Sequence, residues 1–91
     1  MHFEWDDNKA ESNFIKHGIS FEEAVTVFAD PYLQFTEDTK HSEVEEREWA
    51  IGEAENGSMI VVVFTMRGDQ IRIISARKAT KRECRRYEEG I

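Results

Sequence analysis

Two short turns limit what this chain of 91 residues can fold into. Asn56-Gly57 and Gly68-Asp69 separate segments whose side chains alternate between apolar and polar or are rich in β-branched residues. Such dipeptides between such segments are strong signals for two-residue β-hairpin turns. We therefore expect an antiparallel meander of about four strands, over residues 33–37, 47–51, 59–67 and 70–77.

Capping residues predict helices on both sides of this meander. Asp6 and Ser20 are suitable N-caps, and Gly18 between them is suited to end the first of two helices. Thr80 and Glu83 form a capping box that opens a C-terminal helix. With a short apolar strand at residues 3–5, this order predicts an α+β domain, because helices that lie apart from an antiparallel sheet characterise that class.

If both turns contain two residues, the alternation of side chains along a strand assigns each residue to a face of the sheet. Trp49, Phe64 and Ile73 then lie in one core layer under the helices, where Trp49→Ala would cost about 3–5 kcal/mol. Ser75 and Arg77 continue that buried face. A one-residue bulge would change the assignment.

The opposite face of the expected sheet carries both arginines and carboxylates. Arginine clamps phosphate bidentately and stabilises the charge that develops during phosphoryl transfer. A nearby carboxylate is suited to act as general base toward a ribose 2′-OH. The alternative is a set of cross-strand salt bridges on a solvated face. The candidate catalytic residues are Arg67, Arg72, Glu46 and Glu48, with Arg47 assisting from the helix side near a strand end.

The net charge of −7 hides an uneven distribution. Residues 1–64 hold four Lys/Arg and fifteen Asp/Glu, whereas residues 65–91 hold eight Lys/Arg and four Asp/Glu. A local basic region attracts phosphate even on an acidic protein. The alternative is a solvated basic helix that balances the acidic half. The candidate RNA-binding residues in this region are Arg77, Lys81, Arg82 and Arg86.

Other features restrict the class of protein. The one cysteine, Cys84, allows no internal disulfide, and the first residues lack the basic and apolar regions of a signal peptide, so we expect none. The longest apolar run, Met59–Phe64, is far too short to span a membrane. The three histidines lack metal-ligand spacing, so we expect neither a metal nor another cofactor. These features favour a single cytoplasmic domain over residues 1–91.

Several segments along the chain carry a shared and specific pattern. They are Phe3-Glu4-Trp5-Asp6, Lys16-His17-Gly18-Ile19-Ser20-Phe21-Glu22-Glu23-Ala24, Asp30-Pro31, Glu46-Arg47 and Arg72-Ile73-Ile74-Ser75-Ala76-Arg77-Lys78-Ala79-Thr80. Together they resemble the BrnT family of type II toxins. The resemblance implies a RelE-like fold and an endoribonuclease activity that arrests translation and growth. It also implies a BrnA-like antitoxin with a ribbon-helix-helix DNA-binding part, through which alone the complex would contact DNA.

The resemblance also adds Lys16 and His17 to the RNA-binding candidates. Two functions remain open at this point. The first is a metal-independent ribonuclease that uses the substrate's own 2′-OH, and the arginines on the open sheet face favour it. The second is a non-catalytic interaction module that acts as an antitoxin-bound corepressor, which the acidic net charge favours.

Overall fold

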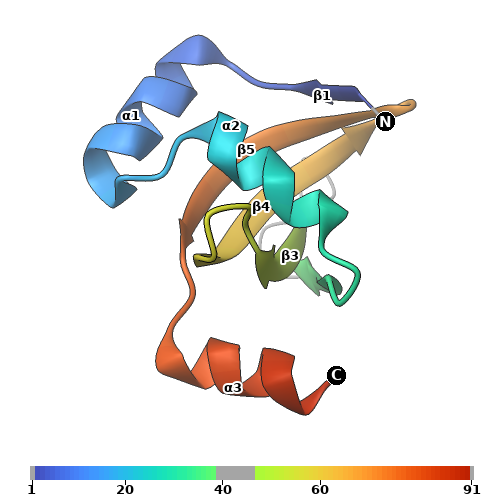
Figure 1. Cartoon of the computed structure of the whole chain (residues 1–91). Helices are drawn as coiled ribbons and strands as arrows, with labels where there is room; N and C mark the ends of the chain where they lie inside the picture. Colours follow the sequence, from blue (N-terminus) through green and yellow to red (C-terminus); the bar gives the residue numbers. More distant parts are fainter. Residues whose placement is uncertain (1, 39–46, 91) are drawn as a thin grey trace.

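Within residues 2–38 and 47–90, which the computed structural model describes, five strands form one mixed sheet with helices on both sides (Figure 1). The strand order is β1-β5-β4-β3-β2. The elements are β1 (His2–Glu4), α1 (Asp7–His17), α2 (Phe21–Val25), the 3₁₀ helix η1 (Thr26–Ala29), β2 (Gln34–Asp38), β3 (Arg47–Glu53), β4 (Met59–Arg67), β5 (Gln70–Lys78) and α3 (Lys81–Glu89).

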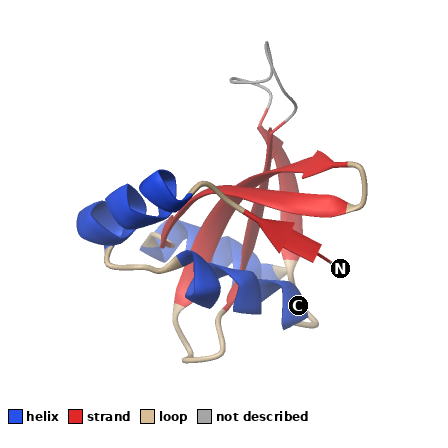
Figure 2. Cartoon of the chain, turned by 90° about the horizontal axis from the view of Figure 1, so that it is seen from above, coloured by secondary structure: helices blue, strands red, loops and turns tan. Residues whose placement is uncertain are grey.

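The antiparallel meander is confirmed for β2 to β5, but the sheet contains one strand more than the four expected. β1 pairs with the outer edge of β5 and runs parallel to it. An unpaired strand edge is a liability, and β1 covers part of the edge that the meander leaves open. Seen from above, α1 lies at one end of the molecule and the β4–β5 hairpin projects at the opposite end (Figure 2).

The predicted capping residues cap the helices in the structure. The Asp6 side chain accepts a hydrogen bond from the Lys9 backbone N–H, and Gly18 ends α1 at a φ of 72°. Ser20 caps α2, and Thr80 forms a full capping box with α3. None of the described helices is both long and apolar enough to cross a membrane.

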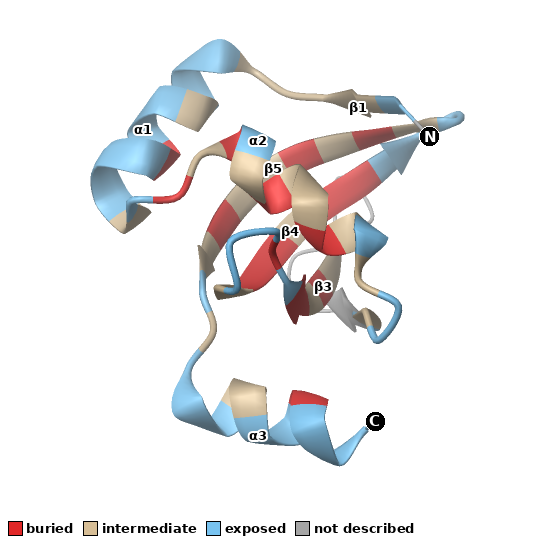
Figure 3. Cartoon of the chain, viewed as in Figure 1, coloured by how far each residue is buried: buried red, intermediate tan, exposed pale blue. Residues whose placement is uncertain are grey.

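The two faces of the sheet differ in what covers them. We call the side packed against α1, α2 and η1 the helix face, and the side that bears α3 at one end the open face. Large side chains fill the helix-face core, and the described part of α3 is mostly exposed (Figure 3). The most completely buried large residues are Ile19, Phe21, Val27, Ile60, Val62, Phe64 and Ile73.

The register between β3 and β4 differs by one residue from the expected register. Glu48 pairs with Phe64, and Trp49 pairs with Val63. The cause is a three-residue loop, in which the Gly57 N–H donates to the Ala54 carbonyl at 2.9 Å and Gly57 has a φ of 89°. A left-handed residue after a type I turn is the usual geometry of three-residue hairpins.

This shift turns every side chain of β3 to the other face of the sheet. The prediction that Trp49 joins Phe64 and Ile73 in the core is wrong, because half-buried Trp49 lies on the open face. The same shift corrects two predicted site residues. Arg47 lies on the open face and not the helix side, and Glu48 lies on the helix face and not the open side.

The register between β4 and β5 agrees with the sequence near the turn. The expected pairs of Phe64 with Ile73, Thr65 with Arg72 and Arg67 with Gln70 are all confirmed. Further along, β5 is shifted by one residue at Ile74, which forms a bulge opposite Phe64 and Val63. The bulge places Ala76 in the core.

The expectation that Ser75 and Arg77 continue the buried face is therefore wrong. Beyond the bulge they pair with Val63 and Val61, and the alternation of the strand turns them to the open face.

A buried asparagine covers the rest of the β5 edge. The Asn13 side chain accepts a hydrogen bond from the Ala76 N–H at 3.0 Å and donates one to the Ala76 carbonyl at 2.9 Å. Its amide also donates to the Ile19 carbonyl at 3.1 Å. Asn13 thus gives β5 the two hydrogen bonds that a neighbouring strand would supply and ties α1 to the sheet.

We predict that Asn13→Ala strongly destabilises the fold. The substitution leaves one N–H and two carbonyl groups without their partner, and such losses together lower the free energy of unfolding by at least about 2 kcal/mol. Ser12→Ala, at the exposed neighbouring position, should change it by no more than about 0.5 kcal/mol. Urea denaturation of both variants measures this, and equal midpoints would contradict the role given to Asn13.

Candidate functional site

The open face brings three of the predicted catalytic arginines together. Arg72 on β5 pairs with Thr65 on β4, and Arg67 lies two residues from Thr65 on the same face. Continuing the β3–β4 register by one residue places Arg47 level with Thr65. Arg47 and Arg72 are half-buried and Arg67 is exposed, so the cluster is accessible to a ligand.

The carboxylate that lies beside Arg72 is not one that the sequence predicted. Glu48 points to the helix face, and Glu46 lies outside the described residues. Glu4 on β1 pairs with Arg72, and its Oε2 lies 3.8 Å from Arg72 Nη1. Sequence reasoning missed Glu4 because nothing local to residues 3–5 shows that this strand joins β5 in parallel.

A second ion pair lies toward α3. Arg77 makes a bidentate contact with Glu83, at 2.7 Å from Nη1 and 2.9 Å from Nη2, and its guanidinium stacks 5.4 Å from the Trp49 ring centre. The hydrogen bonds from Arg77 lower the pKa of Glu83 to about 2, although burial opposes the shift. Hydrogen bonding to Glu83 likewise raises the pKa of Arg77. Because its donors are engaged in this way, Arg77 is better placed to hold α3 than to contact RNA.

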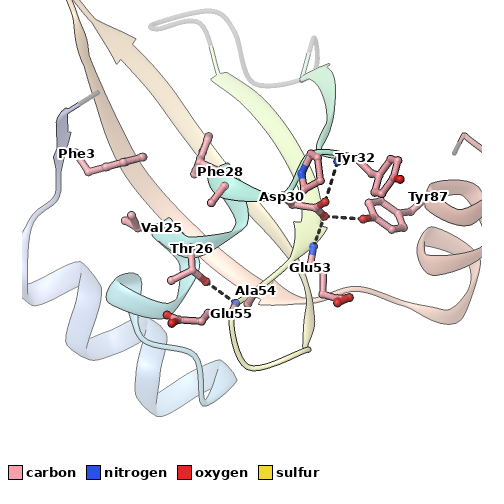
Figure 4. Close-up of a pocket in the computed structure, with 12 residues that line it drawn as sticks. Phe3, Val25, Thr26, Phe28, Asp30, Tyr32, Glu53, Ala54, Glu55 and Tyr87 are labelled. Atoms are coloured by element: carbon pink, nitrogen blue, oxygen red, sulfur yellow. Dashed lines mark hydrogen bonds between the residues drawn. The ribbon is translucent and has the colours of Figure 1, made fainter.

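Asp30 links the end of η1 to β3 and α3 (Figure 4). Its carboxylate accepts hydrogen bonds from the Tyr32 N–H at 2.8 Å, the Glu53 N–H at 2.7 Å and the Tyr87 hydroxyl at 2.5 Å. Burial works to raise the pKa of Asp30, but these hydrogen bonds outweigh it and leave the pKa below its ordinary value. Burial and the bond to Asp30 raise the pKa of Tyr87 to about 12. The sequence indicated only that Asp30-Pro31 ends a helix.

A groove of about 900 Å³ runs beside Asp30 (Figure 4). Phe3, Val25 and Phe28 contribute apolar surface to it, and its charged lining residues, which include Glu53 and Glu55, are all acidic. A groove without a lysine or arginine in its lining is poorly suited to bind phosphate, so the arginines of the open face are the better candidate site.

The predicted RNA-binding residues fall into two separate groups. Lys16 and His17, at the end of α1, line a shallow hollow with Ile74 and Ser75. The exposed residues Lys81, Arg82 and Arg86 lie on α3, which stands apart from α1 in the fold (Figure 1). These predicted RNA-binding residues are therefore carried by two separate helices.

The part of the chain that the structure describes holds no group of three or more His, Cys, Asp or Glu side chains arranged to bind a metal. The site consists instead of cationic side chains on a sheet. A small α+β protein with arginines grouped on one open sheet face belongs to a class suited to bind a phosphodiester backbone.

Comparison with known proteins identifies the family to which this chain belongs. Residues 5–83 match the family described as "Ribonuclease toxin, BrnT, of type II toxin-antitoxin system". The chain belongs to the BrnT family, which confirms the resemblance seen in the sequence and implies an antitoxin partner.

The fold is similar to the crystal structure of the Brucella abortus ribonuclease toxin BrnT. The two chains share 28% sequence identity with a TM-score of 0.69, and the match covers 89% of this chain and 99% of that chain. A search of curated proteins finds no significant match.

We predict that the Arg77–Glu83 pair makes stability depend on pH. The folded-state pKa of Glu83, about 2, lies below its ordinary value of 4.5. Its contribution is therefore complete above about pH 4.5 and is lost as the pH falls toward 2. Glu83→Gln should lower the Tm at pH 7 by roughly 4–8 °C, the shift that about 1 kcal/mol causes in a domain of this size.

The difference in Tm between Glu83→Gln and the wild type should shrink between pH 4.5 and pH 2. Glu88→Gln, which removes an equal charge from an exposed position of α3, serves as the control. A difference that stays constant over this pH range would show that the ionised pair does not stabilise the fold.

Proposed function

We propose that this protein is a metal-independent endoribonuclease that arrests translation by cleaving RNA. The observation that supports this most is the grouping of Arg47, Arg67 and Arg72 on the open face of the sheet. Guanidinium groups so placed bind a phosphate and stabilise the negative charge that its oxygens gain in the transition state. The attacking group is then the 2′-OH of the RNA, and the product is a 2′,3′-cyclic phosphate.

Positioning and charge stabilisation are sufficient for this reaction in principle. The nucleophile is part of the substrate, on the ribose carbon next to the one that bears the reacting phosphate, so the protein has to hold the two in line. A metal ion is one way to stabilise the transferring phosphoryl group, and a set of arginines is another. The proposal of metal independence rests on this arginine set.

The acidic net charge supports a second candidate, an antitoxin-bound corepressor without catalytic activity. A charge of −7 opposes the approach of a polyanion at long range. The charge is unevenly distributed, however, and the register groups the arginines on neighbouring strands of the open face, where they would act on a bound phosphate at short range. We therefore favour the enzyme.

The partner that we propose is a BrnA-like antitoxin with a ribbon-helix-helix part, and DNA would be contacted only through it. We further propose that the fold is RelE-like and that the protein acts in the cytoplasm. The BrnT family membership and its description as a type II system support these proposals.

Cleavage of RNA by the purified protein in the presence of EDTA tests the function. Arg72→Ala should lower the cleavage rate about 10²–10³-fold, the usual loss for one charge-stabilising donor. Its free energy of unfolding should change by no more than about 1 kcal/mol, because a partly exposed ion pair contributes little. Arg86→Ala, an exposed position on α3, should weaken RNA binding mildly and lower its salt dependence, so the loss relative to the wild type shrinks as the salt concentration rises.

Gel electrophoresis of a defined RNA measures the cleavage rate of each variant, and thermal melts measure its stability. Cleavage that stops with EDTA and returns with a divalent ion would contradict metal independence. A folded Arg72→Ala protein that cleaves at the wild-type rate would remove the open face from the proposal. A wild-type protein that binds its antitoxin and never cleaves would favour the corepressor.

Expression from the native operon tests the partnership. We expect a second small protein with a DNA-binding segment to co-purify with this chain and to block RNA cleavage when added to the purified toxin. Size-exclusion chromatography and mass spectrometry identify it. A chain that purifies alone from its operon, and whose activity no neighbouring gene product changes, would contradict the proposed partnership.

A further inference from the structure

We propose that Glu4 is the general base that accepts the proton of the attacking 2′-OH. This inference rests on the ribonuclease activity proposed above. It gives the N-terminal strand β1 a catalytic part in addition to its place at the edge of the sheet.

The first support is the position of Glu4. The parallel pairing of β1 with β5 sets Glu4 level with Arg72, and Arg72 in turn pairs with Thr65 on β4. The side chains of Arg72 and Glu4 are 25% and 34% exposed, so a substrate can reach both. A base must lie within reach of the proton that it removes, and this carboxylate lies beside the group proposed to hold the phosphate.

The second support is a contrast between two Arg–Glu pairs. Arg77 and Glu83 satisfy each other through two short hydrogen bonds, at 2.7 and 2.9 Å. Arg72 and Glu4 lie 3.8 Å apart, which is too long for a hydrogen bond. The carboxylate oxygens of Glu4 can therefore accept a proton, and the donors of Arg72 can turn to a phosphate, without breaking a bidentate pair.

The charged groups around Glu4 are mainly cationic, as is suitable for a site that binds a phosphate. Arg72 faces it from β5, and His2 lies two residues earlier on the same side of β1. Arg67 lies one strand further into the sheet, on β4.

The proposed step moves one proton to Glu4 and exchanges one phosphorus–oxygen bond for another. The proton of the 2′-OH passes to Glu4, and the 2′-oxygen forms a bond to phosphorus. The bond between phosphorus and the 5′-oxygen breaks, and the 5′-oxygen takes a proton from solvent. The products are a 2′,3′-cyclic phosphate and a 5′-hydroxyl end, and Glu4 returns its proton to water.

A purely electrostatic role for Glu4 makes the opposite prediction for Glu4→Gln. If Glu4 only neutralises Arg72, its removal frees a cation and lowers the net negative charge, so RNA binding tightens and the rate does not fall. If Glu4 is the base, kcat falls about 10²-fold or more. KM should then stay equal or decrease.

The experiment measures kcat and KM for cleavage of a short single-stranded RNA oligonucleotide across the pH range in which the protein stays folded by circular dichroism. Glu4→Gln should lose the acid-side fall in rate that a carboxylate base produces, and Glu4→Asp should retain part of the activity. Glu11→Gln, an equal loss of charge at an exposed position of α1, should behave as the wild type.

Two results overturn the assignment and are distinguishable from each other. Wild-type kcat and an unchanged pH profile in Glu4→Gln, with Arg72→Ala inactive, would remove Glu4 from the mechanism and leave the ribonuclease proposal intact. Absence of cleavage by the wild-type protein itself would overturn both proposals together.

Discussion

The composition of the open face depends on two one-residue irregularities in the sheet. Gly57, at a φ of 89°, closes a three-residue loop, and this loop length decides which side chains of β3 turn toward the open face. The bulge at Ile74 does the same for the second half of β5. Because side chains alternate with period two, each extra residue reverses everything beyond it. Arg47, Trp49 and Arg77 all reach the open face for this reason.

The structure uses its two Arg–Glu pairs for different purposes. The bidentate Arg77–Glu83 pair fastens α3 to the sheet, with help from the hydrogen bond between Tyr87 and Asp30. Among the described residues of α3, only Tyr87 is buried, so polar contacts rather than a large apolar surface hold this helix. The looser Arg72–Glu4 pair contributes little to that framework. Its two groups are consequently the ones that can exchange their contact for a substrate.

The features that the sequence could predict are those set by neighbouring residues. Helix caps such as Asp6 and Thr80 depend on residues three positions away, and the Gly68-Asp69 turn correctly paired Thr65 with Arg72. The site was only partly predictable, because Arg67 and Arg72 flank that turn whereas Glu4 joins them from the other end of the chain. The exchange of faces along β3 could not be predicted, since an Asn-Gly pair fits both two-residue and three-residue loops.

β5 contributes both to the stability of the fold and to the proposed chemistry. One half of its outer edge is paired by β1, which carries Glu4, and the other half is closed by the side chain of Asn13. With β4 on its inner side, β5 has a partner along both edges, and this restrains the backbone that carries Arg72. A reaction that depends on positioning requires such restraint, because small displacements of a charged donor cost much of its effect. The buried polar contact at Ala76 therefore supports the arginine cluster without touching it.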